Sequence, residues 1–346
     1  MKKSILIVGL FLSEKNKNKI YRTAADQLAE LLLKNNYAVI KVSFYVGKVF
    51  RFLDTLFSII KNTKKYSIAI VPLYGGTFSL FWSEVSTLLL KFLGKKTILI
   101  IHGGSIPERM NNKSKANNYL RTIKRVDVVV CPSNFIIQSL KKFKVDAFLI
   151  ENVLNLSEYH FHAKENFRPT IFWMRTFEDA YNPLMAMSVF FKLKLIYPNA
   201  KMVMAGRDMG LMNQTKQLAK NLNVIESVVF PGYISNKQKN KIAEEYDIHI
   251  CTNKIDNAPV SMIEMMSLGV PIVSVNSGGI PYLVTNEYDG LLVDVNDDEA
   301  MVEKISSIIN KTELGKQLVK NGLATSKNYD EEPVLKKWQT IFERLN

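Results

Sequence analysis

The chain has 346 residues, of which 47% are hydrophobic and 23% charged, with a formal net charge of +14. This hydrophobic content excludes an intrinsically disordered chain, and the length exceeds the size at which a single core usually stops growing, so we expect two domains. The only two cysteines, Cys131 and Cys251, exclude a disulfide-rich scaffold and predict a reducing compartment.

The first residues superficially resemble a secretory signal. Met1 to Ser4 is basic and is followed by the apolar run ILIVGLFL, but that run is short, has no small-residue cleavage site and leads into charged residues. We interpret it as the first β-strand. No segment approaches the roughly 20 consecutive apolar residues that a membrane-spanning helix needs. The expected location is therefore cytoplasmic.

Predicted strands and helices alternate through the first half of the chain. Strands are expected at residues 4–10, 38–43, 68–74, 97–102, 126–133 and 147–153. Helical segments, such as 23–36 and 82–96, lie between them. This alternation predicts an α/β domain with a parallel, doubly wound sheet.

The positive charge is concentrated in the first half. Lys and Arg outnumber Asp and Glu by 26 to 11 in residues 1–165, whereas the two classes number 20 and 21 in residues 166–346. The first half should therefore meet an anionic partner. We expect no nucleic acid, because the sequence has no helix-turn-helix, zinc-finger or aromatic RNA-binding pattern.

An anionic membrane surface is the expected partner of this basic half. Residues 48–67 carry an apolar stripe at helical spacing, followed by lysines. The stripe is Phe50, Leu53, Phe57 and Ile60, and the lysines are Lys61, Lys64 and Lys65. The chain would then lie peripherally on the inner face of the plasma membrane. The alternative is an ordinary helix packed on a sheet.

The second half repeats the alternation. Strands are expected at residues 170–174, 201–206, 228–234, 247–253, 270–275 and 290–295, with helices at 183–198 and 298–311 among them. This alternation predicts a second Rossmann-like sheet. The boundary is expected between Asn155 and Pro169, where the sequence is polar and turn-rich. Residues 333–345 are helical by pattern.

Two carboxylates stand eight residues apart around a predicted helix start. Asp256 precedes the helix, expected at residues 258–268, and Glu264 lies within it. Pro259 suits the first helical position, and Gly269 suits the position just past the end. The free amides at the start of such a helix favour an anion.

The next strand ends in a glycine pair. Residues 270–275 are rich in β-branched side chains and lead into Asn276-Ser277-Gly278-Gly279, a turn at which backbone can approach a ligand closely. With the acids and the helix start, the arrangement suits a phosphorylated sugar.

The segment D-N-A-P-V-S-M-I-E, followed by S-L-G-V-P-I-V-S-V-N-S-G-G-I-P, resembles the E-x7-E signature of family four glycosyltransferases. Asp256 stands at the first Glu and Glu264 at the second. Other segments match the family in order: IIHGGSIPE, VVVCPSNFIIQSL followed by IENV, FWMRTFEDAYNP with PNAKMVMAG, and VVFPGYI.

The resemblance implies the GT-B fold, in which two Rossmann-like domains face a cleft. Residues 1–160 would form an acceptor-binding domain and residues 161–332 a nucleotide-sugar donor domain, while the terminal helix, residues 333–346, would pack back on the first. The implied reaction is sugar transfer from a nucleoside diphosphate with retention, in cell-surface polysaccharide synthesis. No metal or other cofactor is expected, because no D-x-D pattern or metal-ligand cluster occurs.

Site residues follow from the same resemblance. The catalytic group would be His102, Arg175 and Asp256; the donor-binding group Glu264, Val260, Ser261, Gly206, Gly232, Gly278 and Gly279; and the acceptor-binding group Lys19, Gly103 and Gly104. Residue chemistry supports the first group: Arg175 follows a strand and offers bidentate hydrogen bonds to a diphosphate, and His102 ends a strand before two glycines. Glu264 would accept from the ribose hydroxyls and Asp256 from the sugar hydroxyls.

Several positions depart from the family pattern. The Lys that usually follows the Arg by five residues is replaced by Ala180, and we consider Lys254 as its substitute. Tyr282 occupies the position of a common Glu, and Lys19 and Ile20 replace a glycine pair. These departures leave open a non-catalytic binding subunit. A sugar-nucleotide epimerase, which also uses paired Rossmann sheets, is a further alternative. A nicotinamide oxidoreductase is disfavoured because no G-x-G-x-x-G follows the first strand.

Overall fold

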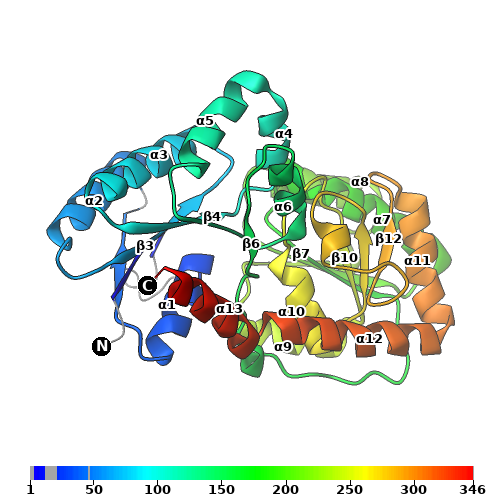
Figure 1. Ribbon diagram of the computed structural model, residues 1–346. Coiled ribbons are helices and arrows are strands. Elements are labelled where there is room, and N and C mark those ends of the chain that lie inside the picture. Colours follow the sequence, from blue (N-terminus) through cyan, green and yellow to red (C-terminus); the bar gives the residue numbers. More distant parts are fainter. Residues whose placement is uncertain (1–3, 12–21, 46, 346) are drawn as a thin grey trace. The chain divides into compact units, whose positions relative to one another are not determined.

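The computed structural model describes residues 4–11, 22–45 and 47–345. The chain divides into two compact units (Figure 1). The first comprises the chain up to Leu154 and again from Asp330 onward, and the second comprises Asn155–Tyr329. The second unit begins at Asn155, and the boundary is expected from the sequence between Asn155 and Pro169. The last helix, α13 (Glu331–Arg344), belongs to the first unit, and the sequence predicts a terminal helix at 333–346.

A six-stranded parallel sheet forms the centre of the first unit. Its strands are β1 (Ile5–Val8), β2 (Val39–Val42), β3 (Ile68–Leu73), β4 (Lys96–Ile101), β5 (Val128–Cys131) and β6 (Phe148–Leu149), in the order β2-β1-β3-β4-β5-β6. The helices are α1 (Ala24–Lys34), α2 (Lys48–Lys61), α3 (Thr77–Phe92), α4 (Ile106–Asn111), α5 (Lys113–Ile123), α6 (Asn134–Lys141) and α13. The order of the strands reverses between β1 and β3.

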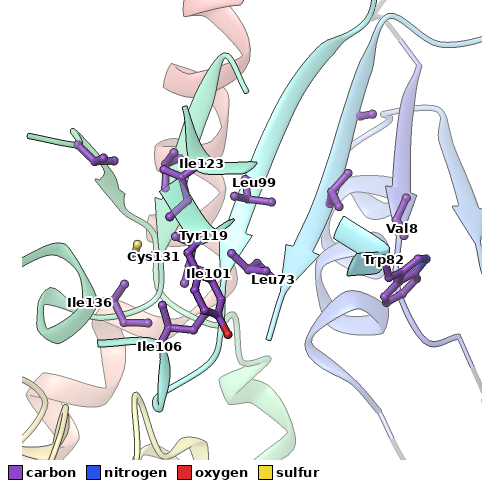
Figure 2. Close-up of a cluster of buried hydrophobic side chains, with 14 of the residues drawn as sticks. Val8, Leu73, Trp82, Leu99, Ile101, Ile106, Tyr119, Ile123, Cys131 and Ile136 are labelled. Carbon is purple, nitrogen blue, oxygen red and sulfur yellow. The ribbon is translucent and has the colours of Figure 1, made fainter. Parts of the chain in front are cut away.

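Alternate residues of each strand enter separate cores on the two faces of this sheet. In β1, Leu6 and Val8 pack into one core and Ile5 and Ile7 into the other, as the two-residue period of a strand requires. Figure 2 shows the first core, in which side chains of the central strands meet Trp82 of α3 and Tyr119 of α5. The second core includes the buried face of α13, formed by Val334, Trp338, Ile341 and Phe342.

Helix α2 keeps most of its apolar side chains outside these cores. Thr55 and Ile59 are buried, whereas Val49, Phe50, Leu53, Phe57 and Ile60 are between 55% and 68% exposed. On the neighbouring helix α3, Phe81, Leu88 and Phe92 are more than half exposed. No helix among the described residues is both long and apolar enough to cross a membrane.

The second unit is also built on a six-stranded parallel sheet. Its strands are β7 (Thr170–Met174), β8 (Lys201–Ala205), β9 (Val228–Gly232), β10 (Ile248–Cys251), β11 (Ile272–Val275) and β12 (Leu291–Val293), in the order β12-β11-β10-β7-β8-β9. The helices are α7 (Pro183–Ile196), α8 (Met212–Asn221), α9 (Asn236–Glu245), α10 (Val260–Leu268), α11 (Asp298–Asn310) and α12 (Thr312–Ser326). All twelve predicted strands and the α/β class are confirmed.

A buried carboxylate fastens the start of this unit to its sheet. The side chain of Asp247, only 1% exposed, accepts hydrogen bonds from Lys164 Nζ at 2.7 Å, from Arg168 Nε at 2.9 Å and from the Arg168 backbone N–H at 2.7 Å. Burial raises the pKa of Asp247, but these donors outweigh it and hold that pKa below its ordinary value. The carboxylate is therefore kept charged.

Candidate functional site

The strand order of the second sheet reverses between β7 and β10, and two charged side chains follow these strands. Arg175 comes directly after β7, and Asp256 lies in the loop after β10. Ligands of open α/β sheets bind outside the carboxyl ends of the strands at such a reversal. The second unit therefore has a topologically favoured binding site at these two residues.

Arg175 and Asp256 form an ion pair through Nη2 and Oδ2, with side chains that are 18% and 14% exposed. The carboxylate also accepts hydrogen bonds from Asn253 Nδ2 and from the Asn257 backbone N–H, both at 2.7 Å. The guanidinium lies over the Tyr181 ring, 4.6 Å from its centroid. Both charged groups are thus held in fixed orientations.

Helix α10 begins beside this pair. Pro259, expected at the first helical position, is instead the N-cap with extended backbone, so the helix starts at Val260. Its first internal hydrogen bond runs from the Met262 N–H to the Pro259 carbonyl at 3.0 Å, which leaves the amides of Val260 and Ser261 ahead of it. Gly269, with φ +81°, ends the helix as predicted.

Glu264 lies one turn further along α10 and is buried. Its Oε1 accepts hydrogen bonds from the Tyr159 hydroxyl at 2.8 Å and from Lys239 Nζ at 2.6 Å. Lys239 belongs to α9, and Tyr159 precedes β7 in the chain. Three separate segments of the second unit therefore meet at one carboxylate.

A pocket of about 220 Å³ lies within the second unit and is lined by Arg175 and Glu264 but not by Asp256. Its walls are formed by Met174, Arg175, Thr176, Ala205, Gly206, Arg207, Tyr233, Ile234, Lys239, Val260, Ser261 and Glu264. Two buried polar atoms of the wall, Arg175 Nε and Ser261 Oγ, make no hydrogen bond to any described residue. Buried donors normally have partners, so a pocket with three cationic side chains and two unpaired donors is suited to an anionic ligand.

Two glycines shape the backbone around the pocket. A Cβ on Gly206, whose φ is +153°, would overlap the Arg175 carbonyl oxygen, and one on Gly279 would overlap the Asn257 carbonyl oxygen. The Gly279 N–H donates to the Asp256 carbonyl at 2.7 Å. The backbone of Gly279 therefore packs closely against the loop that carries Asp256.

The remaining donor residues expected from the sequence take different positions. Gly278, with φ +54°, packs against the Asp256 backbone, as Gly279 does against Asn257. Gly232 ends β9 and is not among the residues that line the pocket.

The first unit holds the other expected catalytic residue. His102 follows β4 and lines a small cavity of about 30 Å³ with Ile7, Ile100 and Trp338. Its ring stacks on Tyr74, with centroids 5.3 Å apart, and burial lowers the pKa of His102 to about 4. The imidazole is consequently neutral at physiological pH.

Of the expected acceptor residues, Gly103 and Gly104 follow His102 in the turn before α4. Lys19 lies outside the described residues.

Sequence reasoning missed Lys239 and Tyr159. It considered Lys254 instead, but the Lys254 amine pairs with Asp179 at 2.5 Å and does not line the pocket. The sequence does not distinguish Lys239 from the other lysines of its polar helix. Only the structure shows that the Lys239 side chain points inward, toward Glu264.

Comparison with known proteins finds a family match within the second unit. Residues 158–325 match the family described as Glycosyl transferases group 1. An uncharacterized glycosyltransferase of Haemophilus influenzae is 30% identical over 151 residues, which is 42% of this chain but only 40% of that protein. A Campylobacter jejuni enzyme is 24% identical over 261 residues, covering 73% of this chain and 70% of the relative. Its name describes an α-1,4-N-acetyl-D-galactosaminyltransferase of diphospho-undecaprenol-linked glycans.

Solved structures share the fold over nearly the whole chain. Sucrose-phosphate synthase from Thermosynechococcus elongatus gives a TM-score of 0.83 at 15% identity, covering 99% of both chains. HepE from Anabaena, in complex with UDP and glucose, gives 0.73 at 14% identity, also covering 99% of both. Residues 158–325 therefore match the group 1 glycosyltransferase family, and the chain has the GT-B fold.

Proposed function

We propose that this chain transfers a sugar, with retention at the anomeric carbon, from a nucleoside-diphosphate donor to a glycan or lipid-linked acceptor in cell-surface polysaccharide synthesis. The observation that carries the proposal is the pocket at the strand reversal, whose buried Arg175 Nε and Ser261 Oγ have no partner among the described residues. A diphosphate leaving group is an anion of the right chemistry to accept from both.

The proposed roles follow from the contacts of each residue. Negative charge develops on the leaving diphosphate during transfer, and donors fixed in advance stabilise it most effectively. Asp256 holds Arg175 through Nη2, so the Nε proton is left for a phosphate oxygen. The amides of Val260 and Ser261 add the positive end of α10. Glu264 would accept from ribose hydroxyls through its second oxygen.

The donor base and the acceptor class are drawn from the relatives. UDP is the nucleotide named in the HepE complex, and an undecaprenol-linked glycan is the acceptor in the name of the Campylobacter enzyme. Both are therefore the first candidates for this chain. His102 and the glycines after it would serve the acceptor, with the neutral imidazole acting by hydrogen bonding rather than by charge.

A lipid-linked acceptor fits the outer face of α2 and α3. The membrane face comprises the exposed apolar residues of the two helices: Val49, Phe50, Leu53, Phe57, Ile60, Phe81, Leu88 and Phe92. Exposed lysines accompany it on the same helices and in the turn between α2 and β3: Lys61, Lys64, Lys65 and Lys91. Apolar side chains with cationic neighbours match the headgroup layer of an anionic bilayer.

Thermal unfolding of the full chain with UDP, GDP, ADP and CMP, alone and as their sugars, tests the donor. A ligand at 100 times its dissociation constant stabilises the folded state by about 2.7 kcal/mol. We expect stabilisation by UDP and its sugars, lost in Arg175→Met and Glu264→Gln and retained in Lys254→Met. Stabilisation by none of these nucleotides would contradict the transferase and favour a non-catalytic subunit.

Product analysis separates transfer from epimerisation. With a radiolabelled UDP-sugar, a transferase releases UDP and labels an undecaprenol-linked glycan only when that acceptor is present. Conversion of the nucleotide sugar without any acceptor would instead support the epimerase.

Vesicle sedimentation tests the membrane face. We expect binding to phosphatidylglycerol vesicles that weakens as salt rises, and little binding to phosphatidylcholine vesicles. The triple variant Phe50→Ser, Phe57→Ser, Ile60→Ser should sediment poorly while still binding UDP. Equal sedimentation of the variant and the wild type would exclude this face, and self-association of the wild type that the variant abolishes would assign it to a second copy.

A further inference from the structure

Helix α9 carries three lysines, and only one of them faces the pocket. Lys237 and Lys241 are exposed, whereas the Lys239 side chain is 11% exposed and its ammonium lies 2.6 Å from Glu264 Oε1. The Glu264 side chain is 9% exposed. Burying two charged side chains costs desolvation free energy, and two apolar side chains in their place would often make the protein equally stable. The ion pair is therefore not explained by a contribution to stability alone.

The hydrogen bonds at Glu264 are distributed unevenly between its two oxygens. Tyr159 and Lys239 both donate to Oε1, and no described residue donates to Oε2. One oxygen is therefore fixed by the protein, and the other is left to a ligand in the pocket that Glu264 lines.

Lys239 is likewise only partly used. An ammonium carries three N–H donors, and among the described residues Glu264 is its one hydrogen-bond partner. Because Lys239 also lines the pocket, the pair presents an acceptor, Glu264 Oε2, beside the spare donors of Lys239 Nζ. A hydroxyl group both donates and accepts, so two neighbouring hydroxyls match this acceptor and donor together.

We infer that Lys239 is a specificity-determining residue for the ribose of the nucleotide: it positions Glu264 through Oε1 and donates to a ribose hydroxyl itself. This inference rests on the proposed function, which places a nucleoside diphosphate in the same pocket. Tyr159 does not line the pocket, so its hydrogen bond can only orient the carboxylate.

Isothermal titration of the full chain with UDP, GDP and ADP, each beside its 2′-deoxy form, tests the assignment. We expect the wild type to bind the ribonucleotide of the preferred base roughly tenfold or more tightly than the deoxy form, because a site built to hydrogen-bond a hydroxyl rejects the analogue without it. Lys239→Met should reduce this ratio to about threefold or less. Lys239→Arg, which keeps a cationic donor, should retain most of it.

Lys241→Met is the matched control, since it removes the same charge from the exposed side of the same helix. It should leave the ribose to deoxyribose ratio unchanged. A purely structural Lys239 would weaken both nucleotides equally, so an unchanged ratio in Lys239→Met overturns the inference, as does a wild type without any preference. If no nucleoside diphosphate binds the wild type, the proposed function itself fails. If a nucleoside diphosphate binds but the ratio does not depend on Lys239, only the inference on Lys239 fails.

Discussion

Arg175 and Asp256 follow β7 and β10, two strands that are adjacent in the sheet although 81 residues separate Arg175 from Asp256 in the chain. Their side chains form an ion pair at the point where the strand order reverses. The pair leaves Arg175 Nε as a buried donor without a partner among the described residues. The carboxylate thus aims the guanidinium and at the same time places a negative charge close to the proposed diphosphate position.

Asp256→Asn should separate binding from turnover. The amide retains an acceptor for Arg175 but loses the charge, so UDP, which has no sugar, should bind as tightly as to the wild type or more tightly. Transfer from the UDP-sugar should fall by roughly 100-fold, because the variant loses a fixed charged group at the reacting sugar. Titration calorimetry and initial rates measure the two effects. A drop in UDP affinity of more than about tenfold would mean that Asp256 serves mainly to build the phosphate site.

Gly279→Ala should destabilise the second unit. The added Cβ would overlap the Asn257 carbonyl, and forcing backbone apart in a packed region costs about 1–3 kcal/mol. Urea unfolding followed by circular dichroism measures the loss. Gly76→Ala is the matched control, because a Cβ at Gly76 would meet nothing within 4 Å. Equal stability of the two variants would show that the glycine turn relaxes freely.

Acid should weaken the second unit through Asp247. Its pKa is lowered in the folded state, so its stabilising contribution is complete above the unfolded pKa of about 3.9 and is lost as the pH falls through the folded value. Asp247→Asn should cost about 3–5 kcal/mol near neutral pH, because Lys164 is left buried without its partner, and should flatten the pH dependence below pH 4. Urea midpoints between pH 3 and 7 measure both. The exposed Asp146→Asn should reproduce the wild-type profile.

His102 should titrate well below an ordinary histidine. Burial lowers its pKa to about 4, so the folded protein binds fewer protons than the unfolded chain between pH 4 and about 6.5. Stability should therefore decline as the pH falls through that interval, and less steeply in His102→Gln. NMR of the imidazole protons, with the signal assigned by its absence in His102→Gln, measures the pKa. A midpoint near 6.5 would show that water reaches the ring.

The sequence was sufficient to predict the sheets because most of their strands are buried on both faces. Runs such as TIFWM and VPIVSV are short, predominantly apolar segments bounded by turn residues, and all twelve expected strands occur. The proximity of Arg175 and Asp256 was predictable for a similar reason: each follows a strand, and the strand ends of a parallel sheet share one edge. Glu264 was expected nearby because it lies one turn into the helix that starts beside Asp256.

Side-chain partners across helices were not predictable in the same way. Lys237, Lys239 and Lys241 look alike in a polar helix, and which one meets Glu264 depends on how α9 packs against α10. The apolar stripe of α2 posed the same difficulty, because an amphipathic pattern does not say whether its apolar side faces a sheet or solvent. The structure exposes Phe50 and Phe57.

The chain enters the second unit at Asn155 and leaves it at Tyr329, and the residues just outside these points, Leu154 and Asp330, form a parallel β-bridge. The second unit is thus an insertion whose entry and exit lie side by side in the host. Two cuts at neighbouring places would release it as one continuous segment with adjacent ends, so an exchange of the second unit needs only two junctions, both beside the bridge between Leu154 and Asp330. Under the proposed function, in which the second unit binds the donor, recombination of this single gene segment would change the sugar that the protein transfers.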